Sequence, residues 1–90
     1  MAWKIEVSPF AERDLAKLDA QHSKRIFRFL NERLAKLDDP RSIGKAMQGP
    51  FLGDFWGYRV GDYRLICTID DDRIVVLLLR VGHRREICRQ

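Results

Sequence analysis

The chain has 90 residues, of which 46% are hydrophobic and 33% charged, and its formal net charge is +4. This length allows one domain, and the balance of apolar and charged residues excludes an intrinsically disordered chain. No apolar run approaches the roughly 18 residues that cross a bilayer, and residues 1–10 lack the apolar core of a secretory signal. Cys67 and Cys88 are too few for a disulfide framework. We therefore expect a cytoplasmic protein with reduced thiols and no membrane partner.

The first half of the chain predicts a strand followed by two helices. Apolar and charged residues alternate over residues 3–7, as in a half-buried strand. Ser8 is expected to be the N-cap of a helix whose first position is Pro9. Two apolar sets recur at helical spacing and are expected to face the core: Phe10, Ala11, Leu15 and Leu18, then Ile26, Phe27, Leu30, Leu34 and Leu37. A break at residues 19–23 makes this a helical hairpin, which ends before Pro40.

The second half predicts a sheet. Residues 38–53 are expected to form a loop, after which strands are expected at 55–60, 63–69 and 73–81. Gly61-Asp62 and the run Asp70–Asp72 separate these strands as hairpin turns. The predicted fold is α+β with the order β-α-α-β-β-β, in which the helical hairpin packs on one face of a small, largely antiparallel sheet. Residues 1–90 are expected to form this single domain.

A two-residue turn at Gly61-Asp62 determines which residues of the hairpin oppose each other. Counting outward from the turn places three apolar pairs on the face that packs on the helices: Trp56 with Cys67, Tyr58 with Leu65, and Val60 with Tyr63. The other face pairs Arg59 with Arg64. Opposed guanidinium groups repel, and they stay charged at neutral pH. The pair is expected to hold an anion such as phosphate, unless an acid such as Asp54 or Glu86 neutralises it.

A second cationic cluster follows the last predicted strand. His83, Arg84 and Arg85 are expected at the strand end, close to Arg64 on the neighbouring strand. His83 is the side chain best suited to exchange a proton near neutral pH. Arg80 shares the face of Arg64 if the preceding loop has three residues, and takes the other face if it has two. With the positive net charge, this clustering favours an anionic partner such as nucleic acid, although a solvated basic surface is the simpler alternative.

The segments RVGDYRL (59–65) and VGHRREIC (81–88) resemble the RelE/ParE toxin superfamily of bacterial type II toxin–antitoxin modules. The resemblance extends to the helical first half and to the chain length. It implies a compact β-α-α-β-β-β toxin. RelE-type members cut mRNA in the ribosomal A site, whereas ParE-type members inhibit DNA gyrase. Both types are silenced by a cognate antitoxin that often represses the shared operon, so operator DNA is expected to be contacted only through the antitoxin.

The resemblance also implies roles for individual residues. Arg64 matches the arginine of the family's YR motif, which contacts the scissile phosphate. Arg84 matches a second catalytic arginine, and His83 is expected to carry the proton. Further contacts to RNA are expected from four cations: Arg59, Arg80, Arg85 and Lys45. The expected partners are therefore the ribosome, mRNA and a cognate antitoxin.

Three positions depart from the family pattern and keep alternatives open. RelE enzymes carry lysines where this chain has Phe55 and Gly57, and many members have a tyrosine where it has Cys88. These departures favour a ParE-like gyrase inhibitor without nuclease activity, whereas Arg64, His83 and Arg84 favour the ribosome-dependent nuclease. A member that only binds its antitoxin and DNA is a third possibility.

The expected chemistry is that of a metal-independent endoribonuclease without a cofactor. No carboxylate cluster in the sequence indicates bound Mg²⁺, because the run Asp70–Asp72 is explained as a turn. The 2′-hydroxyl of the RNA is expected to act as the nucleophile and to leave a 2′,3′-cyclic phosphate. The enzyme then has to orient an in-line attack, stabilise charge on the phosphate oxygens and move two protons.

Overall fold

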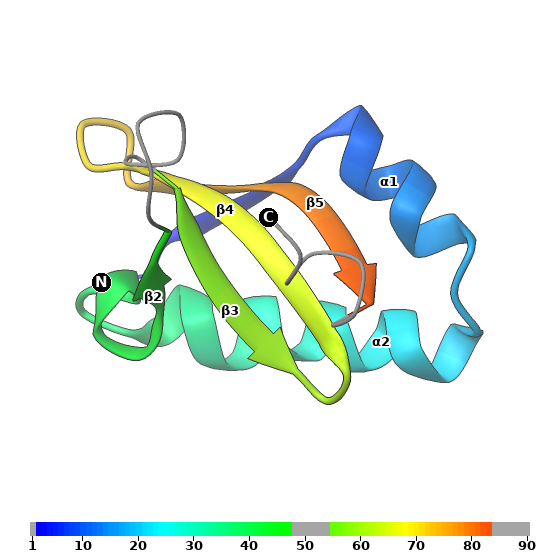
Figure 1. Ribbon diagram of the computed structural model, residues 1–90. Helices are drawn as coiled ribbons and strands as arrows, with labels where there is room; N and C mark the ends of the chain where they lie inside the picture. Colours follow the sequence, from blue (N-terminus) through cyan, green and yellow to red (C-terminus); the bar gives the residue numbers. More distant parts are fainter. Residues whose placement is uncertain (1, 48–54, 84–90) are drawn as a thin grey trace.

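The computed structural model describes residues 2–47 and 55–83, which form a sheet layer and a helical layer. The sheet has five strands in the order β1-β5-β4-β3-β2, with β1 parallel to β5 and the other pairs antiparallel. Figure 1 shows α2 passing behind β3 and β4, and α1 at the side of β5. The elements are β1 (Lys4–Val7), α1 (Pro9–Ala16), α2 (Ala20–Arg28), β2 (Lys45–Ala46), β3 (Trp56–Val60), β4 (Tyr63–Asp70) and β5 (Val75–His83). The predicted α+β class is confirmed, and β2 is an edge strand that the prediction missed.

The two helices follow the predicted order with one change of boundary. Ser8 Oγ accepts a hydrogen bond from the backbone N–H of Ala11, and Pro9 is the first helical residue, as predicted. α2 continues into a π turn at Phe29–Arg33 and a 3₁₀ turn at Leu34–Lys36, so the second helical segment ends before Pro40. It already begins at Ala20, and the predicted break at residues 19–23 is therefore wrong in its extent.

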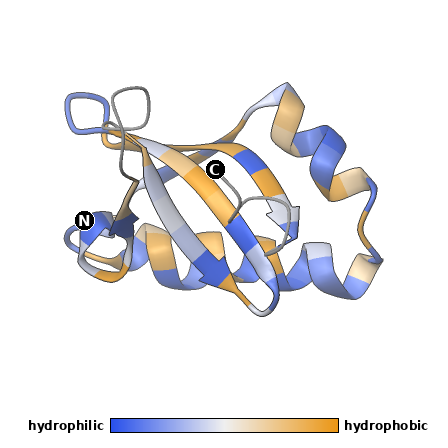
Figure 2. Ribbon diagram, viewed as in Figure 1, coloured by the Kyte–Doolittle hydropathy of each residue, from blue (hydrophilic) through white to orange (hydrophobic). Residues whose placement is uncertain are grey.

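The apolar stripes of the helices are narrower than predicted. Ile26, Leu30 and Leu34 are fully buried, but the side chains of Phe10 and Phe27 are 62% and 40% exposed. These two phenylalanines sit at the margins of their stripes, because each lies about 100° around the helix from a buried neighbour in the chain. Figure 2 shows the resulting alternation of apolar and polar bands on both helices. Within the described residues, no helix has the length and apolar character that a membrane span requires.

The hairpin of β3 and β4 has the predicted register. The four oppositions predicted across the Gly61-Asp62 turn are present, including Arg59 opposite Arg64. Gly61 has a φ of 60°, the left-handed conformation that such a turn needs. Tyr58, Val60, Leu65 and Cys67 are buried in the core, and Trp56 and Tyr63 pack against it. Burial raises the pKa of the Cys67 thiol to about 12, so this thiol stays protonated and acts as a packing group.

The turn between β4 and β5 differs from both predicted lengths. It spans residues 71–74, and the Asp70 carboxylate accepts hydrogen bonds from the backbone N–H groups of Asp72 and Arg73. Further along, Cys67 opposes Leu78 whereas Ile66 opposes Arg80, so one residue of β5 is extra. This β-bulge reverses the alternation of side chains. Because of the bulge, Arg80 opposes Ile66 and has its register position on the same face of the sheet as Ile66 and Arg64. The predicted dependence of this face on loop length alone is therefore replaced by a dependence on the bulge.

Side chains of α1 complete the edge of β5 beyond the end of β1. The last residue of β1 opposes Leu78, which leaves the following backbone groups of β5 without a strand on that side. Ser8 Oγ donates a 2.8 Å hydrogen bond to the carbonyl oxygen of Leu79, and Asp14 Oδ2 accepts one of 2.9 Å from the N–H of Val81. Asp14 also accepts from Arg80 Nε at 2.9 Å. Because buried backbone polar groups must be paired, α1 here substitutes for a strand.

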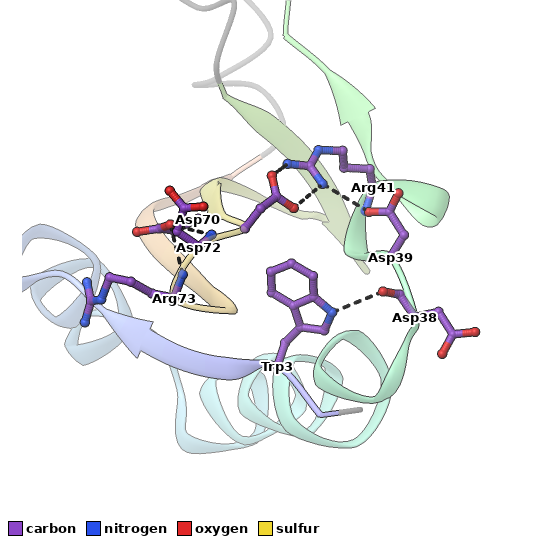
Figure 3. Close-up of polar contacts among 8 residues, drawn as sticks. Trp3, Asp38, Asp39, Arg41, Asp70, Asp72 and Arg73 are labelled. Atoms are coloured by element: carbon purple, nitrogen blue, oxygen red, sulfur yellow. Dashed lines mark hydrogen bonds and ion pairs between the residues drawn. The ribbon is translucent and has the colours of Figure 1, made fainter.

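Arg41 connects the segment before β2 to the turn between β4 and β5. Its Nη1 and Nη2 donate to the two carboxylate oxygens of Asp71 at 3.1 and 2.6 Å, and Nη1 also lies 3.3 Å from Asp39 Oδ1. Figure 3 shows this network beside the indole of Trp3, whose Nε1 donates to the carbonyl oxygen of Asp38. Carboxylates of the predicted Asp70–Asp72 turn therefore form structural contacts.

The Asp14 contacts predict acid-sensitive stability. Burial by itself raises the pKa of Asp14, but the hydrogen bonds from Arg80 and Val81 outweigh it and hold the pKa below its ordinary value. A carboxylate with a lowered folded-state pKa contributes its full stabilisation above the unfolded-state value of about 3.9 and loses it as the pH falls through the folded-state value. We expect Asp14→Asn to lower the free energy of unfolding by about 1–2 kcal/mol at neutral pH.

Urea unfolding between about pH 3 and pH 7 measures this effect, and the difference between wild type and Asp14→Asn is expected to shrink toward zero at the acid end. Asp38→Asn is the matched control, because the Asp38 carboxylate is exposed and, in Figure 3, points away from Arg41 and its partners. A pH-independent difference for Asp14→Asn contradicts the prediction.

Candidate functional site

The face of the sheet that carries Arg59 and Arg64 has a groove of about 460 Å³ between β2, β3 and β4, which we call the sheet groove. Its lining combines cationic and apolar side chains: Lys45, Arg59, Arg64, Ile43, Met47 and Ile66. None of the described residues in this lining is a carboxylate. The groove therefore favours an anionic ligand that also has an apolar part.

The strongest feature of the sheet groove is the opposed pair Arg59 and Arg64. Arg59 is exposed, whereas Arg64 is half-buried, and its Nε is buried without a hydrogen-bond partner among the described residues. A buried charged donor without a partner destabilises the fold by at least about 1–3 kcal/mol, and the two like charges add repulsion. An anion that binds both guanidinium groups removes both penalties. The alternative neutralising acids, Asp54 and Glu86, lie outside the described residues.

Lys45 reaches the groove through the short strand β2. It pairs with Gly57 at the edge of the sheet, two residues from Arg59 in β3. The preceding segment is held close, because the Tyr58 hydroxyl donates a 2.7 Å hydrogen bond to the carbonyl oxygen of Pro40. A Cβ at Gly44 would lie 2.8 Å from the Tyr58 ring, so this approach requires glycine. A two-residue strand has no sequence periodicity, which explains why the prediction of a loop missed it.

Arg80 lies outside the groove lining, although its register position is on the same side of the sheet. Its guanidinium makes an ion pair with Asp14, with Nε–Oδ2 and Nη2–Oδ1 distances of 2.9 and 3.4 Å. The side chain of Asp14 is only 13% exposed, so the pair is largely shielded from water on the acid side. An RNA contact of Arg80 stays a prediction, and the structure gives this arginine an internal counter-ion instead.

The structure places His83 next to the register partner of Arg64, but on the opposite face of the sheet. His83 ends β5 and opposes Tyr63, with ring centroids 5.8 Å apart, whereas the register partner of Arg64 is Gly82. Since Tyr63 packs against the core, His83 lies on the helix side of the sheet. His22 also contacts Tyr63, at 5.3 Å between centroids, and it belongs to α2 rather than to the predicted turn. Three positions considered for the site lie outside the described residues: Arg84, Arg85 and Cys88.

These positions determine what the sheet groove can do chemically. Two arginines and a lysine can bind phosphate oxygens and stabilise charge that develops on them. Neither imidazole nor carboxylate side chains occur in the described part of the lining, so Lys45 and the buried Tyr58 hydroxyl are its only side chains that can transfer a proton. The groove thus fits a phosphodiester, with Ile43, Met47 and Ile66 available to a ribose or base.

Comparisons with known proteins agree on one family. The family model described as the ParE toxin of the type II toxin–antitoxin system parDE matches residues 5–88. Toxin RelG of Mycobacterium tuberculosis is 33% identical over 90 residues, which cover 100% of both chains.

Solved structures show the same fold. A chain in the crystal structure of the toxin–antitoxin complex RelBE2 of M. tuberculosis has a TM-score of 0.85 at 31% identity, covering 93% of each chain. The isolated E. coli RelE toxin has a TM-score of 0.70 at 21% identity, covering 91% of this chain and 84% of that one. A chain of the RelE–RelB complex of Pyrococcus horikoshii has a TM-score of 0.71 at 23% identity, covering 93% and 97%.

Proposed function

Because this chain belongs to the ParE toxin family, and so to the RelE/ParE superfamily of type II toxin–antitoxin toxins, we propose that it is a ribosome-dependent mRNA endoribonuclease that inhibits translation. The observation that carries the proposal is the Arg59–Arg64 pair in the sheet groove, with Arg64 Nε buried and unpaired among the described residues. Permanent charges that face an open groove without a lining carboxylate suit a phosphodiester better than a protein surface.

In the proposed reaction the 2′-hydroxyl oxygen of the RNA attacks the neighbouring phosphorus, and the bond from phosphorus to the 5′ oxygen breaks. The products are a 2′,3′-cyclic phosphate and a 5′-hydroxyl, so one proton leaves the nucleophile and one reaches the leaving oxygen. Arg64 donates to the non-bridging oxygens, where negative charge develops. Arg59 and Lys45 hold the flanking backbone. One such preorganised donor contributes roughly 3 kcal/mol to transition-state stabilisation.

His83 and Arg84 complete the proposed catalytic set. His83 remains the proposed proton carrier, since the exposed imidazole ends β5 one residue after Gly82, the register partner of Arg64. Arg84, which lies outside the described residues, is proposed to share the phosphate charge with Arg64. Because the His83 side chain lies on the helix side of the sheet, it can act only on an RNA that passes the end of β5. Arg85 and Arg80 are proposed as weaker contacts to RNA.

A cognate antitoxin is the proposed protein partner. Two of the three solved structures compared above are toxin–antitoxin complexes, which supports the assignment of such a partner to this chain. Contact with operator DNA is then proposed to occur through the antitoxin, and the ribosomal target places the activity in the cytoplasm.

A second candidate function is inhibition of DNA gyrase without nuclease activity. The sheet groove contains Gly57, and Phe55 precedes it, where RelE-type enzymes carry lysines. The matching family model is also the ParE one. The loss of two cations lowers the phosphate affinity of the groove, which favours this alternative.

Induced expression in a bacterial host separates the two candidates. We expect incorporation of labelled amino acid to stop within minutes while DNA supercoiling stays normal, because cleavage of mRNA halts translation first. Filamentation with DNA damage and continued protein synthesis supports the gyrase inhibitor, and normal growth contradicts both. Arg64→Ala serves as the inactive control in the same experiment, since it removes one guanidinium group of the sheet groove and leaves the other described groove residues in place.

A further inference from the structure

A second basic groove, of about 590 Å³, lies between α2 and β3, and we call it the α2–β3 groove. Four arginines line it: Arg25, Arg28, Arg33 and Arg59. The one acid among the described lining residues is Glu32, whose Oε2 lies 3.8 Å from Arg28 Nε, with side chains 65% and 74% exposed. An exposed ion pair at this distance is weak. The groove therefore keeps a strong positive charge.

The α2–β3 groove is continuous with the sheet groove. The two share Ile43, Tyr58 and Arg59 in their linings. β2 pairs only with Trp56 and Gly57, so among the described residues no strand covers the outer edge of β3 at positions 58–60. Arg59 is exposed at this uncovered edge and borders both grooves. A flexible chain can therefore pass from one groove into the other without crossing a wall.

We propose that a single strand of RNA bound in the sheet groove continues over the β3 edge into the α2–β3 groove, where Arg25 and Arg28 bind phosphates flanking the scissile linkage. This inference rests on RNA as the ligand of the proposed function. Both arginines are exposed on α2 and line the groove, and Arg25 Nη1 comes within 3.0 Å of the position of a Cβ on Gly61, next to the hairpin turn. A series of cations beside an apolar floor is the usual design of a single-strand site.

The floor of the groove supports the same ligand. Phe29 is half-buried and its ring packs 6.0 Å from the Tyr58 ring, which fixes an apolar surface between the arginines. Ile43, which is 37% exposed, extends this surface toward the sheet groove. A ribose or base can lie on these groups while its phosphates meet the guanidinium groups. A free phosphate ion cannot use this floor, so the groove is expected to distinguish a nucleic-acid strand from a simple anion.

The test is the length dependence of RNA binding, measured by fluorescence anisotropy with labelled 2′-O-methyl oligoribonucleotides, which lack the nucleophile and stay intact. A dinucleotide fits the sheet groove alone, whereas an octanucleotide reaches both grooves. For Arg25→Gln/Arg28→Gln we expect octanucleotide affinity to fall about 10-fold near 0.1 M salt, and the slope of log K against log salt to decrease by about 0.7 per lost phosphate contact. Dinucleotide affinity is expected to stay unchanged.

Arg13→Gln/Lys36→Gln is the matched control, because both side chains are exposed, line neither groove and remove the same charge. An equal loss of octanucleotide affinity in this control overturns the inference, since general attraction then explains the binding. The inference also fails if wild type binds both probes with equal affinity or binds neither. Duplex DNA is the third probe, and a loss for it as large as for RNA assigns the groove to duplex backbone and overturns the single-strand path.

The outcome is separable from that of the proposed function. The binding assay needs no cleavage. If wild type shows the expected dependence of RNA binding on length and salt but cuts no mRNA on ribosomes, the proposed RNA path stands and the proposed nuclease activity is wrong. Conversely, if Arg25→Gln/Arg28→Gln changes neither mRNA cleavage nor octanucleotide affinity, the proposed nuclease activity stands and the proposed RNA path is wrong.

Discussion

Arg64→Ala is expected to lower the rate of mRNA cleavage on programmed ribosomes by about 100- to 1,000-fold, the usual effect of removing one preorganised donor from a developing oxyanion. Arg64 is the group for this role because it lines the sheet groove, and its Nε is buried without a partner among the described residues. Truncation also removes a like-charge opposition with Arg59, so stability is expected to stay the same or to rise.

The measurement is single-turnover cleavage followed by primer extension, with thermal unfolding of each variant as a check of the fold. Arg64→Lys retains the charge but loses the planar fork of the guanidinium group, and we expect its cleavage rate to lie between those of wild type and Arg64→Ala. Arg13→Ala removes an exposed arginine of α1 and is expected to cleave at the wild-type rate. Unchanged cleavage by Arg64→Ala removes the proposed catalytic role.

Leu65→Ala is expected to lower the free energy of unfolding by about 2–5 kcal/mol, the range for removal of a fully buried leucine. Leu65 is 0% exposed and lies in β4, opposite Tyr58 on one side and Val81 on the other. It therefore holds the three central strands against the helices. A domain of this size has a small stability margin, so the loss is a large fraction of the total.

Urea denaturation measures this effect, and Phe10→Ala is the control that separates burial from hydrophobicity. Phe10 is larger than leucine but 62% exposed, so its truncation is expected to change the free energy of unfolding by less than about 1 kcal/mol. Equal losses in the two variants contradict the prediction that the burial of Leu65 in the core, and not its hydrophobicity alone, sets the loss of stability.

The hairpin and its arginine pair were predictable because they depend only on local rules. A two-residue turn sets the register, and the alternation of side chains then places Arg59 opposite Arg64 on the face away from the helices. The N-cap at Ser8 was predictable for the same reason, since capping involves neighbours within one turn.

The membership of the site was less predictable, because it depends on elements that are distant in the chain. Lys45 joins the groove only through its pairing with Gly57, and no pattern in a two-residue strand indicates that pairing. His83 was expected at the strand end close to Arg64, and it does follow Gly82, the register partner of Arg64. The sequence left its face of the sheet undecided, and the opposition to Tyr63 places it on the helix side.

The sequence by itself determined the α+β class, the order of the elements other than β2, and the opposition of Arg59 and Arg64, because turn length and side-chain periodicity act over a few residues. Only the tertiary structure decided which cations have an internal partner. Arg80 meets Asp14 across 66 positions of the chain, whereas no carboxylate in the described lining of the sheet groove neutralises Arg64. Such pairings follow from how α1 packs along β5, and periodicity carries no information about contacts at that separation.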